Sequence, residues 1–306
     1  MKVWIAKAIV QKAISYMPFK HRINYLFQRY VTKGVLLTDA LMDDKLTHCQ
    51  THLQQFFKHR GVQSGCTTLE LGTGWYPIVP IGFYLAGADK IYSIDVSDLL
   101  ETEAIKHTIR RYLQYHQSGK LATFLPQVDT ARLAKLEGLL TQNLPPHQML
   151  EQLNIYTILG DARNTKFADA SFDLINSNNT FEHIYPEILL PILVEFKRLL
   201  KPNGLMSHFI DMSDHFAHFD KSISVYNFLR FTGQEWSWID NSVQPQNRSR
   251  IYTHRQLHQQ AGFKVLEEVN RPGSVEELKT VPLAQPFAAH PAADVAITHS
   301  LFVSEK

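Results

Sequence analysis

Two glycines and a carboxylate have the spacing of a site for a ribose-containing ligand. Gly72, Thr73 and Gly74 follow the short apolar run 67–71 and precede an apolar helical segment. Glycine lets the backbone adopt positive φ angles and approach a ligand closely. Asp95 ends the next apolar run, 21 residues after Gly74. A carboxylate at that position can accept both hydroxyls of a ribose. The spacing therefore predicts a nucleotide-like cofactor.

Further residues distinguish between a dinucleotide and S-adenosylmethionine (SAM). Glu70 lies two residues before Gly72, where an acid suits the ammonium group of SAM. Pro77 replaces the third glycine of a dinucleotide fingerprint, although a pyrophosphate needs backbone N–H groups at that helix start. Asp161 and Ala162 follow the third predicted strand, where an acid beside a small residue suits an adenine amino group. Together these features favour SAM over NAD, and they disfavour a tight turn without a ligand.

These motifs resemble those of the class I SAM-dependent methyltransferases over about residues 60–303. The matching segments are 70–74, Asp95, 161–162, 172–179 with 181–184, and 198–204. The resemblance implies an α/β fold, with a Rossmann-like seven-stranded, mainly parallel sheet and an antiparallel last strand. It also implies that SAM is surrounded by Glu70, Gly72, Thr73, Gly74, Asp95, Val96, Asp161, Ala162, Ser177 and Asn178.

The sequence pattern agrees with that fold because β-rich runs alternate with helical segments. Strands are predicted at 67–71, 91–96, 155–159, 172–176, 205–210, 263–269 and 295–303. Helical segments are predicted at 78–86, 98–153 with a break at its prolines, 186–200 and 253–261. The connection 270–294 has no predicted helix, so its two flanking strands are expected to form an antiparallel edge hairpin.

Four regions are expected from these boundaries. Residues 1–60 form an N-terminal helical cap, within which Thr38 begins and Gly61 ends one helix. Residues 61–306 form the SAM-binding domain. Within it, 98–153 is a helical insertion and 211–252 is an aromatic-rich insertion after strand five.

Histidines at the ends of two strands are candidate catalytic bases. His183 follows the fourth predicted strand, and His215 and His218 follow the fifth. Methyl transfer from a sulfonium mainly needs alignment, but a hydroxyl acceptor also needs a base. The alternative for His183 is that it orders the loop at a helix start, and the alternative for His215 and His218 is that they belong to a solvated polar loop. Glu182 is interpreted as a first-turn charge at a helix N-terminus rather than as a catalyst.

A metal site is the competing interpretation of the histidine-rich loop. The candidate ligands are Asp211, Asp214, His215, His218 and Asp220. Cation-dependent O-methyltransferases also need an acid at the end of strand four, where this chain has Ser177 and Asn178. We therefore predict no metal.

Bulky side chains around the predicted cleft are candidate substrate contacts. Trp75 and Tyr76 depart from the family pattern after the glycines and are expected to narrow the entrance. Seven aromatic residues lie within 216–239. They either line a substrate pocket, with Tyr226, Arg230 and Trp236 as contacts, or form a small core of their own.

Composition limits the class of protein. The chain of 306 residues is 44% hydrophobic and 20% charged, as in globular proteins. A net charge of +2 disfavours nucleic-acid partners. Two cysteines without a CxxC motif indicate a reducing, cytoplasmic location, and no apolar run reaches the ~20 residues of a membrane span. Residues 1–60 hold 10 basic and 3 acidic residues, so a basic amphipathic membrane contact is the alternative to a cap.

The expected function is SAM-dependent methylation of a small metabolite, with oxygen as the favoured acceptor and S-adenosylhomocysteine as the product. A non-methyl displacement, such as cyclisation or aminocarboxypropyl transfer, uses the same motifs and stays open. A non-catalytic SAM-binding subunit also stays open. A homodimer is a further expectation.

Overall fold

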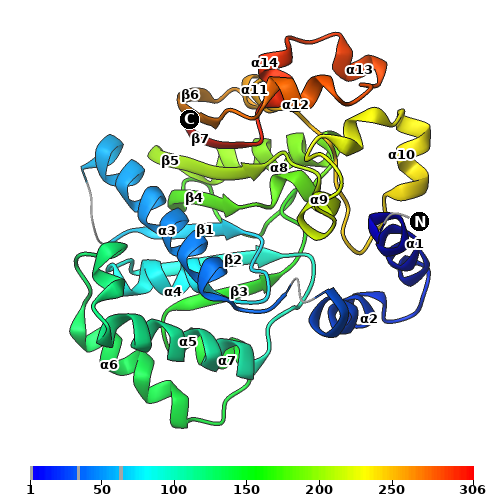
Figure 1. Cartoon of the computed structure of the whole chain (residues 1–306). Helices are drawn as coiled ribbons and strands as arrows, with labels where there is room; N and C mark the ends of the chain where they lie inside the picture. The colour runs from blue at the N-terminus through cyan, green and yellow to red at the C-terminus, as the bar shows by residue number, and fades with distance from the viewer. Residues whose placement is uncertain (1–2, 33–34, 62–64) are drawn as a thin grey trace.

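Seven short strands form a single sheet that is covered by helices on both faces (Figure 1). The computed structural model describes residues 3–32, 35–61 and 65–306. The strands are β1 (Thr67–Leu71), β2 (Lys90–Asp95), β3 (Ile155–Leu159), β4 (Phe172–Asn178), β5 (Leu200–Asp211), β6 (Lys264–Arg271) and β7 (His299–Glu305). Their order in the sheet is β3-β2-β1-β4-β5-β7-β6.

All strands except β7 run in the same direction. β1 pairs in parallel with β2 and β4, β2 with β3, and β4 with β5. β7 is antiparallel to both β5 and β6. The predicted Rossmann-like sheet with a reversed last strand is therefore confirmed. Because the carboxyl ends of parallel strands share one edge, the segments after β1 to β5 meet there.

Two apolar layers hold the helices against the sheet. One layer is formed with α3 (Asp39–Arg60), α4 (Ile78–Leu85), α5 (Thr102–Gln117), α6 (Thr130–Gly138) and α7 (Pro146–Glu151). The other is formed with α8 (Pro186–Leu199) and α11 (Ile251–Gln260). Consecutive strand residues alternate between the layers, so Leu174 belongs to the first and Ile175 to the second.

The helix α3 begins and ends where the sequence predicts. The Thr38 hydroxyl oxygen accepts a hydrogen bond from the backbone N–H of Leu41, and Gly61 ends the helix with a φ of +68°. The buried side of α3 includes His48 and His52 as well as apolar residues. The helix therefore brings two imidazoles against the sheet.

A third apolar cluster joins the N-terminal helix to the segment after β5. α1 (Val3–Ser15) lies beside α9 (His215–Phe219) and α10 (Gly233–Ile239) (Figure 1). Trp4 of α1 shares this cluster with Phe216, Tyr226 and Trp236. Most of the aromatic-rich segment is therefore a core that α1 completes. After α1, the chain continues through α2 (Lys20–Phe27) and a π-helical turn (Gln28–Thr32).

The connection between β6 and β7 differs from the prediction. It contains three short helices, α12 (Val275–Lys279), α13 (Gln285–Ala288) and α14 (Ala292–Ala296). Because α14 occupies 292–296, β7 begins at His299 rather than at Val295. Prolines at the starts of α13 and α14 are compatible with a first helical turn, so they do not indicate a loop. The predicted antiparallel edge pairing of the two strands is confirmed.

Two other element predictions also need correction. The segment 98–153 has more breaks than the one predicted at its prolines: it contains α5, α6 and α7 together with 3₁₀ turns at Lys120–Thr123 and Leu139–Thr141. Gly119 has a φ of +77° after α5, and Asp129 caps the start of α6. Residues 201–204, which precede the predicted strand 205–210, lie within β5, whose pairing with β4 is irregular there.

In the described part of the chain, no helix has both the length and the apolar character that crossing a bilayer requires.

Candidate active site

The turn after β1 depends on both glycines. Gly72 has a φ of +89° and Gly74 a φ of +64°, which other residues rarely adopt. A Cβ atom on Gly72 would lie 2.6 Å from Thr180 Oγ1, so the turn also packs tightly against the segment after β4. The Gly72 N–H donates to Ile94 O at 2.9 Å, and the Gly74 N–H donates to Asp95 Oδ2 at 3.4 Å. These bonds hold the turn against the end of β2.

Carboxylates lie after β2 and β3 at the same edge of the sheet. Asp95 Oδ1 accepts a hydrogen bond from the Ser97 N–H at 3.0 Å, and burial raises the pKa of Asp95. Asp161 is exposed and its oxygens accept hydrogen bonds from the Arg163 guanidinium, which lowers the Asp161 pKa. Ala162 is buried. Both acids therefore lie at the predicted edge, but a ligand must share Asp161 with Arg163.

Two large apolar side chains beside these acids are exposed. Val96 is 79% exposed and Leu159 is 64% exposed. Leu159 pairs with Asp95 in the register of β2 and β3. Exposed apolar groups at a ligand-binding edge can pack against a flat apolar ring. Val96 is predicted from the sequence as a cofactor contact, but Leu159 is not. Its position at the end of β3, directly before Gly160 and Asp161, could have indicated Leu159 as well.

Glu70 is the centre of a buried chain of polar side chains. Its Oε1 accepts a hydrogen bond from Asn178 Nδ2 at 2.9 Å, and its Oε2 accepts one from Ser93 Oγ at 3.4 Å. Ser93 Oγ lies 2.7 Å from Thr73 Oγ1 in the glycine turn. Burial raises the pKa of Glu70 to about 8. The protonation of this buried acid is therefore coupled to the turn that follows β1.

The polar chain continues from β4 to α3 and β5. His52 Nε2 lies 3.1 Å from Asn178 Oδ1, and His52 Nδ1 lies 2.7 Å from Ser207 Oγ. Because Asn178 donates its amide to Glu70, its oxygen is the group that accepts from His52 Nε2–H. Burial lowers the pKa of His52 to about 3, so this imidazole is neutral at pH 7. His52 is not among the site residues predicted from the sequence. Its position among the apolar residues of α3 could have indicated that it faces the sheet.

Ser177 does not lie beside Glu70, in contrast to Asn178. The Ser177 hydroxyl is 2.9 Å from His208 Nδ1. The His208 ring stacks on Phe181 in the layer beneath α8. Consecutive residues of a strand point to opposite faces, so only one of the two side chains can reach Glu70. Any contact of Ser177 with a cofactor at this edge must come from its backbone.

The three predicted catalytic histidines lie close together. His183 ends a 3₁₀ turn (Phe181–His183) after β4, whereas His215 and His218 lie on α9. The ring centroids of His183 and His215 are 5.1 Å apart, and those of His215 and His218 are 5.3 Å apart. His183 Nδ1 lies 2.6 Å from the carbonyl oxygen of Pro245. The structure thus assembles one imidazole cluster from two segments.

One carboxylate at the end of β5 contacts three imidazoles. Asp211 Oδ2 is 3.5 Å from His215 Nε2 and 3.9 Å from His218 Nε2. Asp211 Oδ1 is 3.4 Å from His299 Nε2. Burial tends to raise the pKa of Asp211, but hydrogen bonding with His215 outweighs it and holds this pKa below its usual range. Asp211 is therefore an anion that orients the cluster.

The imidazoles differ in basicity. Burial lowers the pKa of His183 to about 4 and that of His218 to about 4. Burial acts in the same direction on His215, but its hydrogen bond to Asp211 outweighs burial and raises its pKa. Of these three histidines, His215 is the best suited to accept a proton near neutral pH.

Glu182 is buried rather than exposed at a helix start. It is 3% exposed, and neither carboxylate oxygen has a hydrogen-bond partner among the described residues. Burial raises its pKa to about 8. Glu182 lies in the first turn of the 3₁₀ helix Phe181–His183, whereas α8 begins only at Pro186. Glu182 belongs with His183 and His215 to a group whose potential ligand atoms all lie within 4.8 Å of one another.

The other acids of the histidine-rich loop have structural partners. Asp214 caps α9 by accepting a hydrogen bond from the Phe216 N–H. Asp220 accepts one from the Trp4 N–H at 3.1 Å. These contacts stabilise the packing of α9 and α1.

The aromatic residues after the glycine turn contact the N-terminal segment. Trp75 stacks on Tyr25 of α2 with ring centroids 4.3 Å apart. The Tyr76 hydroxyl donates a hydrogen bond to the carbonyl oxygen of Val35 at 3.0 Å. The N-terminal segment therefore lies directly beside the predicted cofactor turn.

The predicted substrate contacts after β5 do not share one pocket. Tyr226 is fully buried and its hydroxyl donates to Ala296 O at 2.8 Å, whereas Arg230 is exposed. Tyr226 belongs to the aromatic core, whereas Arg230 lies at the exposed end of the 3₁₀ turn Asn227–Arg230. Trp236 does line a small cavity, together with His215.

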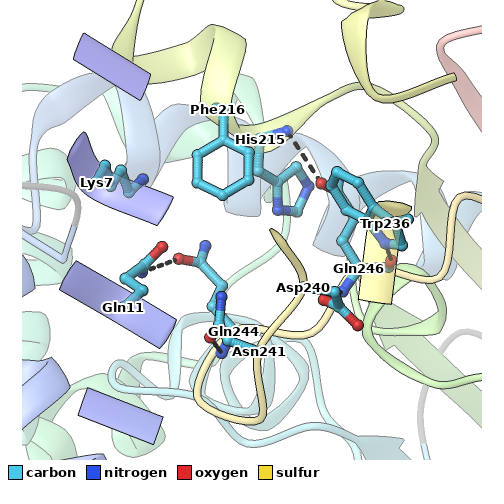
Figure 2. A pocket seen from close by; sticks show the side chains of 9 residues that line it. All are labelled: Lys7, Gln11, His215, Phe216, Trp236, Asp240, Asn241, Gln244 and Gln246. Carbon is cyan, nitrogen blue, oxygen red and sulfur yellow. Dashed lines mark hydrogen bonds between the residues drawn. The ribbon is translucent and has the colours of Figure 1, made fainter. Parts of the chain in front are cut away.

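That cavity lies between α1 and the segments after β5. Figure 2 shows Lys7 and Gln11 of α1 on one side, with Phe216, His215 and Trp236 on the other. Burial lowers the pKa of Lys7. The remaining lining residues are Asp240, Asn241, Gln244 and Gln246 (Figure 2). Polar and charged side chains therefore make up most of the lining of this small cavity.

Comparison with known proteins agrees with the fold. The model of a methyltransferase domain family matches residues 134–207, from α6 into β5. A solved structure from Pyrococcus horikoshii OT3 is 15% identical with a TM-score of 0.50, and the match covers 91% of this chain and 97% of that chain. No curated protein sequence matches the chain. The matched segment and the strand order are those of a SAM-dependent methyltransferase fold, in agreement with the resemblance that the sequence motifs carry.

Two further solved structures are more distant. A SAM-dependent methyltransferase from Mesorhizobium loti is 11% identical with a TM-score of 0.45, covering 84% of this chain and 96% of that chain. A 1,6-didemethyltoxoflavin-N1-methyltransferase from Burkholderia thailandensis, solved with its toxoflavin precursor and S-adenosylhomocysteine, is 11% identical with a TM-score of 0.45. That match covers 93% of this chain and 86% of that chain.

Proposed function

We propose that the chain transfers the methyl group of SAM to an oxygen atom of a small molecule. The observation that carries this proposal is the position of the Asp211–His215 pair at the sheet edge that also holds the glycine turn. An imidazole oriented by a buried carboxylate can act as a general base. Asp95, Gly72 and Gly74 supply the cofactor site. The Asp211–His215 pair supplies the base for a hydroxyl acceptor.

The cofactor contacts follow from the strand ends. Asp95 would accept the ribose hydroxyls, because its carboxylate already faces the Gly74 N–H. The adenine ring would pack between Val96 and Leu159, with its amino group near Asp161. Glu70 lies deeper and accepts from Asn178, so we propose that it acts on the methionine end through the turn.

Methyl transfer is an in-line displacement. The acceptor oxygen forms a bond to the methyl carbon while the carbon–sulfur bond breaks, and the bonding pair returns to sulfur. His215 takes the hydroxyl proton, and Asp211 stabilises the resulting imidazolium. The chain mainly aligns the reacting atoms, because the sulfonium is already an activated donor.

We propose that the N-terminal helices cap the cleft and exclude water during the reaction. The stack of Tyr25 on Trp75 and the bond of Tyr76 to Val35 connect this segment to the glycine turn. Lys7 and Gln11 place α1 at the cavity that His215 lines. A cleft that is covered by helices in this way favours a small metabolite over a macromolecule as substrate.

Calorimetric titration with S-adenosylhomocysteine, and separately with NADH, tests the cofactor. We expect micromolar binding of S-adenosylhomocysteine alone, lost at least tenfold in Asp95→Ala, because hydrogen bonds to a charged group contribute ~1.5–3 kcal/mol. Asp89→Ala is a matched control, since Asp89 precedes β2 at the opposite end of the strand. NADH binding would contradict the proposal.

Product analysis then separates the possible reactions. Incubation with isotopically labelled SAM and a panel of hydroxylated metabolites should give S-adenosylhomocysteine and a labelled ether or ester. Methylthioadenosine would indicate a different displacement. SAM binding without turnover, and unchanged by His215→Ala, would indicate a non-catalytic subunit.

A further inference from the structure

We propose that Glu182, His183 and His215 bind one divalent transition-metal ion of the zinc type. One carboxylate oxygen and one nitrogen from each imidazole lie within 4.8 Å of one another. The ligands come from two segments, the 3₁₀ turn after β4 and the helix α9. Because the two segments are separated in the sequence, it is the fold that brings the three groups together.

The burial of Glu182 without a hydrogen-bond partner in the part of the chain that the structure describes is the strongest sign that a ligand is missing beside its carboxyl group. Its side chain is 3% exposed and both oxygens lack a hydrogen-bond partner among the described residues. A buried carboxylate without a partner is unfavourable, and such groups are normally paired or coordinate a metal. No lysine or arginine forms an ion pair with Glu182 in the described part of the chain. A cation between this oxygen and the two imidazoles would satisfy it.

Both imidazoles are oriented as metal ligands are. His183 Nδ1 lies 2.6 Å from Pro245 O, so this nitrogen carries the proton and Nε2 keeps a free lone pair. His215 Nε2 faces Asp211 Oδ2 at 3.5 Å. Histidine ligands usually donate their second N–H to a carbonyl or carboxylate, which fixes the ring. Each ring here has such an acceptor.

The ligand types select the ion. Mg²⁺ and Ca²⁺ prefer sites made of oxygen atoms, whereas two imidazoles and one carboxylate suit Zn²⁺ and its neighbours. Three protein ligands leave a position for water or for a substrate oxygen. In that position the ion would acidify a bound hydroxyl; this role rests on the proposed methyl transfer, although the binding site does not. With the ion bound, His215 is a ligand and the metal replaces it as the activating group.

This site differs from the metal site that the sequence suggests as an alternative. That alternative requires an acid at the end of β4, where Asn178 lies, and takes its other ligands from the loop after β5. The carboxylate instead comes from Glu182, four residues after β4 ends. The prediction of no metal is therefore replaced by this proposal.

Metal titration without any substrate tests the site. Purified full-length protein is dialysed against a chelator and titrated with Co²⁺, followed by absorbance, and with Zn²⁺, followed by calorimetry. We expect one ion per chain, a Co²⁺ spectrum of low coordination number, and displacement of Co²⁺ by Zn²⁺. Glu182→Gln and His183→Gln should each weaken Zn²⁺ binding at least tenfold. Because no substrate is present, this result is independent of whether methyl transfer occurs.

Two control variants make the test specific. Glu187→Gln changes an exposed acid at the start of α8, and His116→Ala changes an exposed histidine of α5; both should bind Zn²⁺ as the wild type does. Circular dichroism checks that each metal-free variant is folded, and Zn²⁺ should raise the melting temperature of the wild type but not of Glu182→Gln. Absence of stoichiometric binding, or equal binding by Glu182→Gln, His183→Gln and the controls, would overturn the proposal.

Discussion

Asn178 Nδ2 donates a hydrogen bond to Glu70 Oε1 across 2.9 Å and so joins β4 to β1 through their side chains. These strands are neighbours in the sheet but are separated in the chain by β2 and β3. The bond gives the buried Glu70 its shortest side-chain partner and fixes the amide orientation that His52 requires. One amide group therefore connects the buried acid beneath the cofactor turn to the sheet and to α3.

Asn178→Ala should destabilise the protein by about 1–3 kcal/mol. The substitution removes a donor and leaves a buried carboxyl oxygen without its partner. Urea unfolding at pH 7 measures the loss. Asn203→Ala, an exposed position within β5, should change the free energy of unfolding by less than ~0.5 kcal/mol. An equal loss in both variants would contradict the importance of the Glu70 contact.

The stability difference between the wild type and Glu70→Gln should depend on pH. Burial raises the Glu70 pKa from 4.5 to about 8, so the folded state favours the protonated acid. Its contribution is fully present below pH 4.5 and is lost as pH rises through about 8. The free energy of unfolding of the wild type, minus that of Glu70→Gln, should fall by about 1–4 kcal/mol across this window.

Urea unfolding at pH 5 and pH 8 checks this difference. Other titrating groups cancel because they are present in both proteins. The corresponding comparison with Glu187→Gln should show no trend, since Glu187 is exposed. A constant difference between the wild type and Glu70→Gln would show that Glu70 ionises normally.

Glu195 should show the opposite pH dependence. It accepts hydrogen bonds from the Arg198 guanidinium and from Thr165, which lower its pKa to about 2. Its contribution is present above pH 4.5 and is lost as pH falls through about 2. Glu195→Gln should cost about 1–3 kcal/mol at pH 7, and the cost should shrink by pH 3. A cost that is the same at both pH values would refute the ion-pair explanation.

Tyr25→Ala should accelerate the release of S-adenosylhomocysteine if α2 caps the cleft. The variant removes the ring that stacks on Trp75 at 4.3 Å, and such a stack contributes ~0.5–1.5 kcal/mol. The dissociation rate in stopped-flow measurements should rise about twofold to tenfold. Tyr30→Ala, an exposed tyrosine of the neighbouring turn, serves as control. Identical rates for the two variants would remove the support for a cap.

The sequence predicted the sheet well because its signals are local. The strands β1, β3 and β4 begin at predicted residues, and Gly72 and Gly74 mark the turn through their backbone conformation. The carboxylates Asp95 and Asp161 follow from their positions at strand ends. Such features depend on a few neighbouring residues, so they can be inferred without knowing the tertiary structure.

The parts that could not be predicted depend on tertiary contacts. His52 reaches Asn178 only because α3 lies across β4 and β5. Glu182 resembles an ordinary first-turn acid until the start of α8 is known to be Pro186. Tyr226 and Arg230 have the spacing of one α-helical turn, but the chain there forms a 3₁₀ turn. The tyrosine is buried and the arginine is exposed.

The position of β7 also has a consequence for synthesis of the chain. β6 pairs only with β7 among the described strands, yet it precedes β7 in the chain. A ribosome therefore delivers β6 before its partner exists, and its backbone donors and acceptors stay unpaired until the helices of 275–296 and then β7 have emerged. Unpaired strand edges promote association between chains. The edge of β6 therefore stays open to other chains until β7 pairs with it, and His299 reaches Asp211 only once β7 is in place.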